Sequence, residues 1–313
     1  MPALSQINAT EEEEVHAALA QIPVLPLLGR SWTGSWRIAR LPSLTNRSFL
    51  VERGEGEAYV LRLPGKGTAR YIDRAGEAAN ATAAAAIGLA PPILHADPAS
   101  GVMLSRYLTD AVPLSPARLK EADHFRAAIG LLKRLHESGL AFQGEMHLYP
   151  KIDQYLAMAS TPALRELRRA GEGLRPLIER DWFGGPRPCH IDPAPHNFIA
   201  VGQRHFLLDW EYAAMCTPLW DLAGISIEGH FDAAQDSAML ALYFGEGVDP
   251  AAWLSRLHLY RIMLRLVAAS WGAAHIAESN GAWTAAELVD PLVALTAADL
   301  ADPALARHIE RAG

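Results

Sequence analysis

The feature of this sequence that most restricts its fold is a short hairpin with polar residues at both ends. Two apolar runs, residues 198–201 and 206–209, are separated by Gly202–Gln203. Short apolar runs around a glycine turn are typical of a β-hairpin. Because a hairpin returns the chain to its starting point, Asp209 at the end of the second run is predicted to lie near Asn197 at the start of the first.

A second carboxylate precedes the hairpin. Asp192 lies on the loop that leads into the first run, and Pro193 and Pro195 stiffen this loop. Asp192, Asn197 and Asp209 are therefore expected to converge on one small volume. Asn197 and Asp209 supply the hard oxygen ligands that a phosphate-bound magnesium ion prefers. Asp192 can accept the proton of an attacking hydroxyl, so the set fits phosphoryl transfer.

The spacing of these residues is also that of a known motif. The pattern H-x-D-x-x-x-x-N, beginning at His190 and followed by a strand-ending Asp, has the spacing of the protein-kinase catalytic loop and metal-binding Asp. His190 is expected to pack behind the loop and order it. Two other interpretations stay open. The polar residues could be ordinary turn residues, or His190, Asp192, His196 and Asp209 could bind a transition metal for hydrolysis, although no H-E-x-x-H spacing supports this.

Composition excludes several classes of protein. The chain has 313 residues and a formal charge of −7, which argues against nucleic acid as the main partner. Glu11 to Glu14 do not resemble a basic signal sequence, and no apolar run approaches the roughly 20 residues that span a bilayer. With only Cys189 and Cys216, a reducing, cytoplasmic location without membrane insertion is expected. Cys189 is interpreted as a buried residue that ends a strand, rather than as a nucleophile.

The first third of the chain favours a small sheet with one helix. Thr10 and Glu13 form a capping box pattern that predicts a short first helix. An alanine-rich helix is expected over residues 71–87. Strands are predicted over residues 36–41, 48–52, 58–63 and 102–108.

Helices dominate from Ser115 onward. Ser115 and Pro116 predict a helix start, and Gly139 predicts its end, with an apolar stripe between them. A second stripe runs from Leu257 to Trp271. The predicted fold is α+β and bilobal. Its N-terminal lobe, residues 1–105, is a small antiparallel β-sheet with one helix, and its C-terminal lobe, residues 106–313, is larger and mainly helical.

Five stretches make the sequence resemble the choline/ethanolamine kinase family, and bacterial choline kinases in particular, within the aminoglycoside-phosphotransferase and protein-kinase-like superfamily. They are L-T-N-R-S-F from Leu44, Y-V-L-R-L-P-G-K-G-T from Tyr59, Arg74 to Glu77, L-L-K-R-L-H-E-S from Leu131, and H-I-D-P-A-P-H-N from His190 continuing through L-D-W-E-Y-A-A-M-C-T-P-L-W-D-L-A. One departure is that Pro42–Ser43 replaces the glycines that the family has before L-T-N.

The resemblance implies ATP and Mg²⁺ as cofactors and a protein-kinase-like fold. Asp192 would be the catalytic base, and Asn197 and Asp209 would hold the metal. Arg62 matches a cation that contacts the phosphates, and Glu77 matches its acidic partner. The residues implied in nucleotide binding are Thr45, Asn46, Ser48, Arg62, Glu77, Ser105 and Tyr107.

The resemblance further implies a small alcohol acceptor carrying a cationic amine, with choline as the first expectation. Its contacts would be Glu211, Tyr212, Glu228 and Trp271, since aromatic faces and carboxylates suit a quaternary ammonium. The family often has a second tryptophan one turn before Trp271, where this chain has Ala268. Ethanolamine, thiamine or an aminoglycoside therefore stay open as acceptors. Two further alternatives also stay open. The protein could form a homodimer, or it could be catalytically silent and bind a nucleotide or a cationic ligand.

Overall fold

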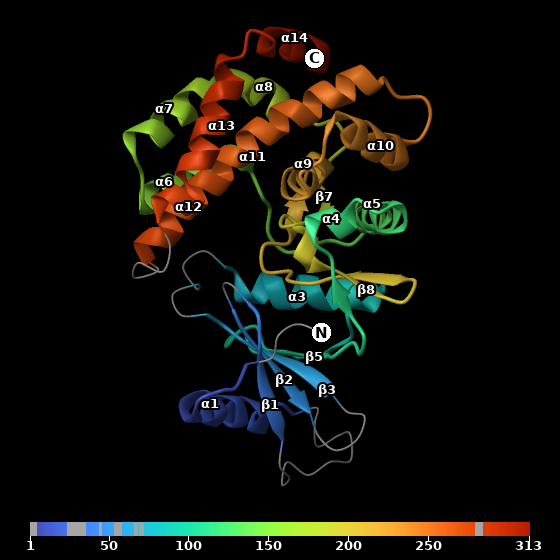
Figure 1. Cartoon of the computed structure of the whole chain (residues 1–313), viewed down its shortest axis with the longest axis vertical. Coiled ribbons are helices and arrows are strands. Elements are labelled where there is room, and N and C mark those ends of the chain that lie inside the picture. The colour runs from blue at the N-terminus through green and yellow to red at the C-terminus, as the bar shows by residue number, and fades with distance from the viewer. Residues whose placement is uncertain are drawn as a thin grey trace. The chain divides into compact units, whose positions relative to one another are not determined.

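The structure of the chain is a computed structural model (Figure 1). It describes residues 5–23, 36–43, 46–52, 58–65, 68, 72–278 and 284–313. The chain forms two compact units. The first unit contains residues 1–114, 142–144 and 196–213, and the second contains residues 115–141, 145–195 and 214–313.

A five-stranded antiparallel sheet forms the body of the first unit. Its strands lie in the order β1-β2-β3-β5-β4. They are β1 (Arg37–Leu41), β2 (Arg47–Glu52), β3 (Ala58–Leu63), β4 (Ile93–Ala96) and β5 (Met103–Arg106). Four of the five match the strand predictions to within one or two residues. The prediction missed β4, a four-residue edge strand with a register irregularity. Its sequence, Ile-Leu-His-Ala, does not alternate apolar and polar residues, so it lacks the usual pattern of a strand with one buried face.

Helix α1 (Ala9–Ala20) covers one face of this sheet. Val15 and Leu19 of α1 belong to a buried apolar cluster with Phe49, Leu61 and other sheet residues. The predicted capping box at Thr10 was wrong. Asn8 is the N-cap, and it exchanges hydrogen bonds with Glu11. Two patterns with the same spacing overlap here, and asparagine is as good an N-cap as threonine or better, so the helix begins earlier.

The alanine-rich segment forms α3 (Arg74–Ala86), which packs on β4. Asp73 caps its start by accepting hydrogen bonds from the backbone N–H groups of Ala75 and Gly76. The prediction that this segment is helical is confirmed. The helix begins at Arg74, three residues later than expected.

The predicted hairpin is confirmed. Strands β8 (Phe198–Val201) and β9 (Arg204–Leu207) pair in antiparallel register around Gly202–Gln203, and β6 (Val112–Pro113) completes a three-stranded sheet. Gly202 has a φ of 56°, which suits glycine in a two-residue hairpin turn. The second strand begins and ends two residues earlier than expected, so Asp209 follows the strand instead of ending it.

The second unit is mainly helical and is built around the long helix α11 (Pro250–Glu278), against which α6, α9, α13 and α14 pack (Figure 1). The apolar stripe predicted on α11 is buried at Leu257, Tyr260 and Leu264. The remaining helices are α4 (Pro116–Leu119), α5 (Ala122–His136), α6 (Leu148–Met158), α7 (Pro162–Ala170), α8 (Arg175–Ile178), α9 (Pro218–Glu228), α10 (Ala233–Phe244), α12 (Ala285–Leu288), α13 (Asp290–Ala301) and α14 (Leu305–Ala312). A two-stranded sheet joins β7 (Arg187–Cys189) to β10 (Ala214–Cys216).

The single helix predicted from Ser115 to Gly139 is interrupted. Ser115 caps α4 through a hydrogen bond from the backbone N–H of Arg118, as expected, but Glu121 is extended and separates α4 from α5. No proline or glycine marks this break. Both helices bury their part of the same apolar stripe, at Leu119 and Ile129, so tertiary packing rather than local sequence sets the interruption.

The fold is of α+β class, as predicted. The division into lobes of residues 1–105 and 106–313 stays a prediction, since each compact unit contains several chain segments. Within the described part of the chain, none of the helices combines the length and the apolar character that crossing a membrane requires.

Candidate functional site

A buried cation, Arg62, is the centre of the polar cluster in the first unit. Strand β3 carries Arg62, and α3 presents Glu77, with which Arg62 forms an ion pair. Arg62 Nη1 also lies 3.2 Å from Asp209 Oδ1, so this guanidinium contacts two carboxylates. Glu77 in turn accepts a hydrogen bond of 2.7 Å from Arg74 Nη1. The Arg62–Glu77 pair that the resemblance implied is thus present.

Electrostatics keep Arg62 charged despite its burial. Burial opposes the charge, but the neighbouring carboxylates of Glu77, Asp209 and Glu211 outweigh this effect and raise the pKa of Arg62 above its ordinary value. A guanidinium fixed in this way can hold two phosphate oxygens without losing its proton.

Three carboxylates lie together beside this arginine. Oxygen atoms of Glu77, Asp209 and Glu211 are all within 4.8 Å of one another, an arrangement that could hold a metal ion. Glu211 is buried and accepts a hydrogen bond of 2.6 Å from Asn46 Nδ2. The structure thus places Glu211, predicted as an acceptor contact, with Asn46, predicted as a nucleotide contact. The acceptor role of Glu211 stays a prediction.

The hairpin links the two predicted metal ligands. The backbone N–H of Leu208 donates to the carbonyl of Asn197 at 2.8 Å, which ties Asn197 to the residue before Asp209. Asp209 has a φ of 60°, a left-handed conformation that asparagine and aspartate tolerate better than other non-glycine residues. Its side chain is 35% exposed, so the carboxylate remains accessible although Arg62 contacts it.

The other predicted nucleotide contacts lie on neighbouring strands of the same sheet. Ser48 pairs with Arg62 across β2 and β3. Ser105 lies on β5 opposite Val60, and the backbone N–H of Tyr107 donates to Ala58. Their contacts to a nucleotide stay predictions. Thr45 lies outside the described residues.

Sequence reasoning missed a buried asparagine on α3. Asn80 Nδ2 donates to the carbonyls of Gln143 and Ala213, at 3.0 and 2.7 Å, and Asn80 Oδ1 accepts from the N–H of Gln143. Asn80 therefore fixes the segment that follows Asp209 and Glu211. The signal was a polar residue inside an alanine-rich helix, because a buried polar side chain requires partners.

In the second unit, Asp221 anchors the loop that carries the predicted base. Asp221 Oδ2 accepts a hydrogen bond from the backbone N–H of His190, and Oδ1 accepts one from that of Ile191, both at 2.7 Å. Asp221 lies in the first turn of α9 and is fully buried, as is His190. The loop immediately before Asp192 is therefore held by charge-assisted hydrogen bonds.

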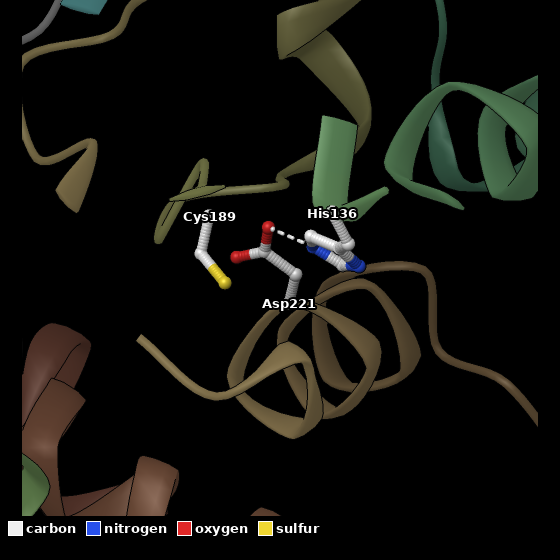
Figure 2. Close-up of side chains that lie close together, drawn as sticks. All are labelled: His136, Cys189 and Asp221. Atoms are coloured by element: carbon white, nitrogen blue, oxygen red, sulfur yellow. Dashed lines mark hydrogen bonds and ion pairs between the residues drawn. The ribbon is translucent and has the colours of Figure 1, made fainter. Parts of the chain in front are cut away.

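Asp221 also contacts the buried imidazole of His136, as Figure 2 shows. His136 Nε2 lies 3.0 Å from Asp221 Oδ2, and His136 Nδ1 lies 2.8 Å from the hydroxyl of Tyr243. Cys189 completes a group of possible metal ligands. However, both ring nitrogens and both carboxylate oxygens already have partners, and burial raises the pKa of the Cys189 thiol well above its ordinary value. This group is a structural anchor, and the interpretation of Cys189 as a buried strand end is confirmed.

The residue before Asp192 has a strained backbone. Ile191 has a φ of 74°, which is rare for a β-branched residue. Its N–H is bound by Asp221, and its carbonyl accepts a hydrogen bond of 2.9 Å from Trp220 Nε1. The first turn of α9 thus holds both backbone polar groups of Ile191. Strain that persists under such constraint is typical of functional sites.

The predicted acceptor contacts are spread over the chain. Tyr212 is half-buried in the first unit, and Glu228 is exposed at the end of α9. Trp271 stacks on His275 one turn further along α11, with ring centroids 4.8 Å apart. A common acceptor site for these residues stays a prediction. The convergence of Asp192 with Asn197 and Asp209 likewise stays a prediction, because Asp192 belongs to the second unit and the other two belong to the first.

Comparison with known proteins defines the family. Residues 37–255 match the phosphotransferase enzyme family named APH. Protein LicA of Haemophilus influenzae is 30% identical over 209 residues, which cover 64% of this chain and 76% of LicA. The family match begins at β1 and ends within α11, so it includes both polar clusters.

Solved structures agree in fold over almost the entire chain. A choline/ethanolamine kinase family protein from Mesorhizobium loti is 34% identical, with a TM-score of 0.80 and coverage of 96% of this chain and 98% of that protein. The choline kinase LicA from Streptococcus pneumoniae is 22% identical, with a TM-score of 0.78 and coverage of 94% and 99%. The chain therefore belongs to the phosphotransferase enzyme family, with the bilobal protein-kinase-like fold that it shares with these choline and ethanolamine kinase structures.

Proposed function

We propose that this protein is an ATP-dependent kinase that phosphorylates the hydroxyl group of a small amino alcohol, and that choline is its acceptor. The observation that carries the proposal is the 34% identity to a choline/ethanolamine kinase family protein across 96% of the chain, with a TM-score of 0.80. Identity of this extent over almost the whole of both chains supports a similar activity as well as a similar fold.

Asp192 is proposed as the base. In phosphoryl transfer, a carboxylate that orients the attacking hydroxyl and accepts its proton is a recurring component. The half-buried Asp192 follows the clamped Ile191 peptide. Because the backbone of Ile191 is fixed at its N–H and its carbonyl, the position of the following carboxylate is restricted before the acceptor arrives. Such preorganisation lowers the entropy that the reaction must lose at the transition state.

Asn197 and Asp209 are proposed to hold Mg²⁺. Their oxygen atoms are of the hard type that this ion prefers, and the carboxylate of Asp209 is partly exposed and adjacent to two other carboxylates. Bound Mg²⁺ would neutralise charge on the phosphates of ATP. Arg62 is proposed to contact these phosphates, while Glu77 keeps its guanidinium in place.

Tyr212, Glu228 and Trp271 are proposed to bind the ammonium group of the acceptor. Aromatic faces attract a quaternary ammonium through their quadrupole, and a carboxylate adds Coulomb attraction. Trp271 is the residue with an aromatic partner on its own helix, since it stacks on His275. His275 is thus an aromatic neighbour one turn after Trp271, whereas Ala268 lies one turn before it.

The test is a panel of acceptors. ADP release in the presence of Mg²⁺ and ATP would be measured with choline, ethanolamine, thiamine and kanamycin. The proposal expects kcat/KM for choline to exceed that for each other acceptor by at least about tenfold, which corresponds to about 1.4 kcal/mol of differential transition-state binding. Preference for kanamycin would identify an antibiotic kinase instead. Nucleotide binding without turnover of any acceptor would identify a silent binding protein.

A further inference from the structure

A pocket that the proposed reaction does not use opens at the start of α9. Its volume is about 610 Å³. Five parts of the second unit line it: the first turn of α6 with the residues just before it, β10, the first turn of α9, the end of α8 with the segment that follows it, and Tyr260 of α11. A volume of this size is within the range of small-molecule sites and exceeds that of a simple amino alcohol.

The floor of the pocket is aromatic, and three of its buried polar groups donate hydrogen bonds to backbone carbonyls. Trp220 Nε1 donates to the carbonyl of Ile191, and the hydroxyl of Tyr260 donates to that of Ile178. The thiol of Cys216 also donates to a backbone carbonyl. These side chains are all buried. Because their hydrogen-bonding groups are already occupied, the floor presents ring faces and hydrocarbon to a ligand. It therefore suits an apolar or aromatic group.

The rim carries an excess of carboxylates. Glu145, Glu179 and Asp181 line the pocket, and Arg180 is the arginine among the lining residues. The guanidinium of Arg180 stacks on Trp182, at 4.3 Å from the ring centroid, and also donates to a backbone carbonyl. Its charge is therefore directed toward the protein. Three carboxylates against one occupied guanidinium disfavour an anionic ligand and favour a cationic one.

Two of these carboxylates remain well exposed. The side chain of Glu145 is 64% exposed and contacts the exposed His147, and that of Glu179 is 43% exposed and pairs with Arg175. Asp181 accepts hydrogen bonds from backbone N–H groups of the following loop, which lower its pKa. All three acids thus have local partners, yet Glu145 and Glu179 keep oxygen surface that a ligand can approach.

The pocket is separate from the residues proposed to bind the acceptor. Tyr212, Glu228 and Trp271 are not among its lining residues. Glu228 is the last residue of α9, whereas Trp220 is in the first turn. Helix α9 has 11 residues, and at 1.5 Å per residue its two ends are about 16 Å apart.

We propose that this pocket is a second binding site, for an organic cation with an aromatic or aliphatic body. The body lies on the floor formed by Trp220 and Tyr260, and the cationic group faces Glu145 and Glu179 at the rim. The identity of the phosphoryl acceptor does not enter this assignment.

The floor also connects the pocket to the catalytic loop. The same indole N–H of Trp220 that closes the floor holds the carbonyl of Ile191, the strained residue before Asp192. A ligand that packs on the Trp220 ring restricts its movement and keeps this hydrogen bond formed. Occupancy is therefore expected to reduce local opening of the loop around Ile191.

Calorimetric titration of the full chain with benzyltrimethylammonium tests the site, with benzoate as the anionic counterpart of similar size. We expect the cation to bind at least tenfold more tightly than benzoate. Because this cation could also enter the proposed acceptor site, the titration is repeated in Trp271→Ala, where binding to the pocket should persist. Met215→Trp, which places a larger side chain on the pocket wall, should abolish it.

A charge variant and a matched control sharpen the test. Glu145→Gln should weaken binding about threefold. Glu137→Gln, which removes an equally exposed carboxylate outside the pocket, should leave it unchanged. Binding that is lost in Trp271→Ala and kept in Met215→Trp would overturn the assignment, as would equal affinity for benzoate or no binding of the cation.

Hydrogen exchange tests the connection to the loop without requiring catalysis. In Trp271→Ala saturated with benzyltrimethylammonium, exchange of the peptide that contains Ile191 should slow at least twofold, and Met215→Trp should show no such change. Bound ligand with unchanged exchange around Ile191 would remove Trp220 as the connection, while the titration would still decide whether the site exists.

Discussion

At the residue scale, Arg62 is stabilised in a buried position by three carboxylates from two parts of the first unit. Glu77 comes from α3, and Asp209 and Glu211 come from the segment after β9. The sequence resemblance implied the Arg62–Glu77 pair. It did not indicate that Glu211 lies beside this pair. Glu211 is held by a hydrogen bond from Asn46, 165 positions away, and a contact between residues so distant in sequence leaves no local pattern.

Glu77→Gln should destabilise the protein. The substitution leaves the charge of Arg62 with Asp209 as its remaining direct ion-pair partner and removes the ion-pair partner of Arg74. Removing one partner of a buried ion pair costs about 3 kcal/mol. Urea unfolding measures the change. The matched substitution Glu12→Gln, on the exposed side of α1, should change the unfolding free energy by less than about 0.5 kcal/mol. Equal effects of the two substitutions would contradict the role of Glu77.

At the scale of elements, the first turn of α9 positions the loop that precedes Asp192, the proposed base. Asp221 and Trp220 bind the backbone of residues 190 and 191, and Gly224 allows Pro193 to pack closely, because an added Cβ would lie 3.0 Å from the proline ring. A helix, a loop and a proline thus form one rigid arrangement immediately around Asp192.

Asp221→Asn should lower the free energy of unfolding more than Tyr243→Phe does. The amide of asparagine has one acceptor oxygen, so one of the two backbone N–H groups loses its partner in a buried position. We expect a loss of about 2–3 kcal/mol. Tyr243→Phe, which removes only the hydroxyl contact to His136, should cost about 1 kcal/mol. Guanidinium unfolding of both variants provides the comparison, and the reverse order of effects would contradict the anchoring role.

The docking of α14 on α11 should depend on pH. His258 of α11 and His308 of α14 have ring centroids 4.4 Å apart, and burial, followed by His308, lowers the pKa of His258 below its ordinary value of 6.5. The folded state therefore disfavours the proton that the unfolded state binds. This contribution to stability is fully present above about pH 6.5 and is lost as the pH falls through the lowered pKa.

His258→Gln should reduce that pH dependence. Melting temperatures at pH 7.5 and pH 5.0 give the measurement. We expect the decrease between the two pH values to be smaller in His258→Gln than in the wild type. His16→Gln, at an exposed position on α1, should leave the decrease unchanged. A decrease of the same size in all three proteins would show that His258 does not contribute.

The sequence predicted elements where a local pattern was unambiguous and failed where packing decided. The hairpin, the alanine-rich helix and the α11 stripe have such patterns. The N-cap of α1 was misplaced because two capping patterns overlap, and Glu121 interrupts a helix without any breaking residue. Asn80 and Asp221 were not recognised as anchors because their partners are carbonyl and N–H groups that are distant in sequence.

At the scale of the whole molecule, the fold class could be predicted and the membership of the compact units could not. Residues 196–213 belong to the first unit although they follow a helical region, because β8 pairs with β6. As a result, the proposed catalytic residues come from both units within a stretch of 18 residues, from Asp192 to Asp209. Between Pro195 and His196 the chain passes from the second unit to the first.

The central claim is that Asp192 serves a transfer of phosphate from ATP to choline. Phosphorus NMR of a mixture of protein, Mg²⁺, ATP and choline tests it most directly, because it resolves the product ester from free phosphate. We predict one phosphoester of choline for each ADP with the wild type, and at least a thousandfold slower formation with Asp192→Asn, whose affinity for ATP should stay within about twofold of the wild type. Ester formation at the wild-type rate by Asp192→Asn, or ADP accompanied only by inorganic phosphate in the wild type, would contradict the account.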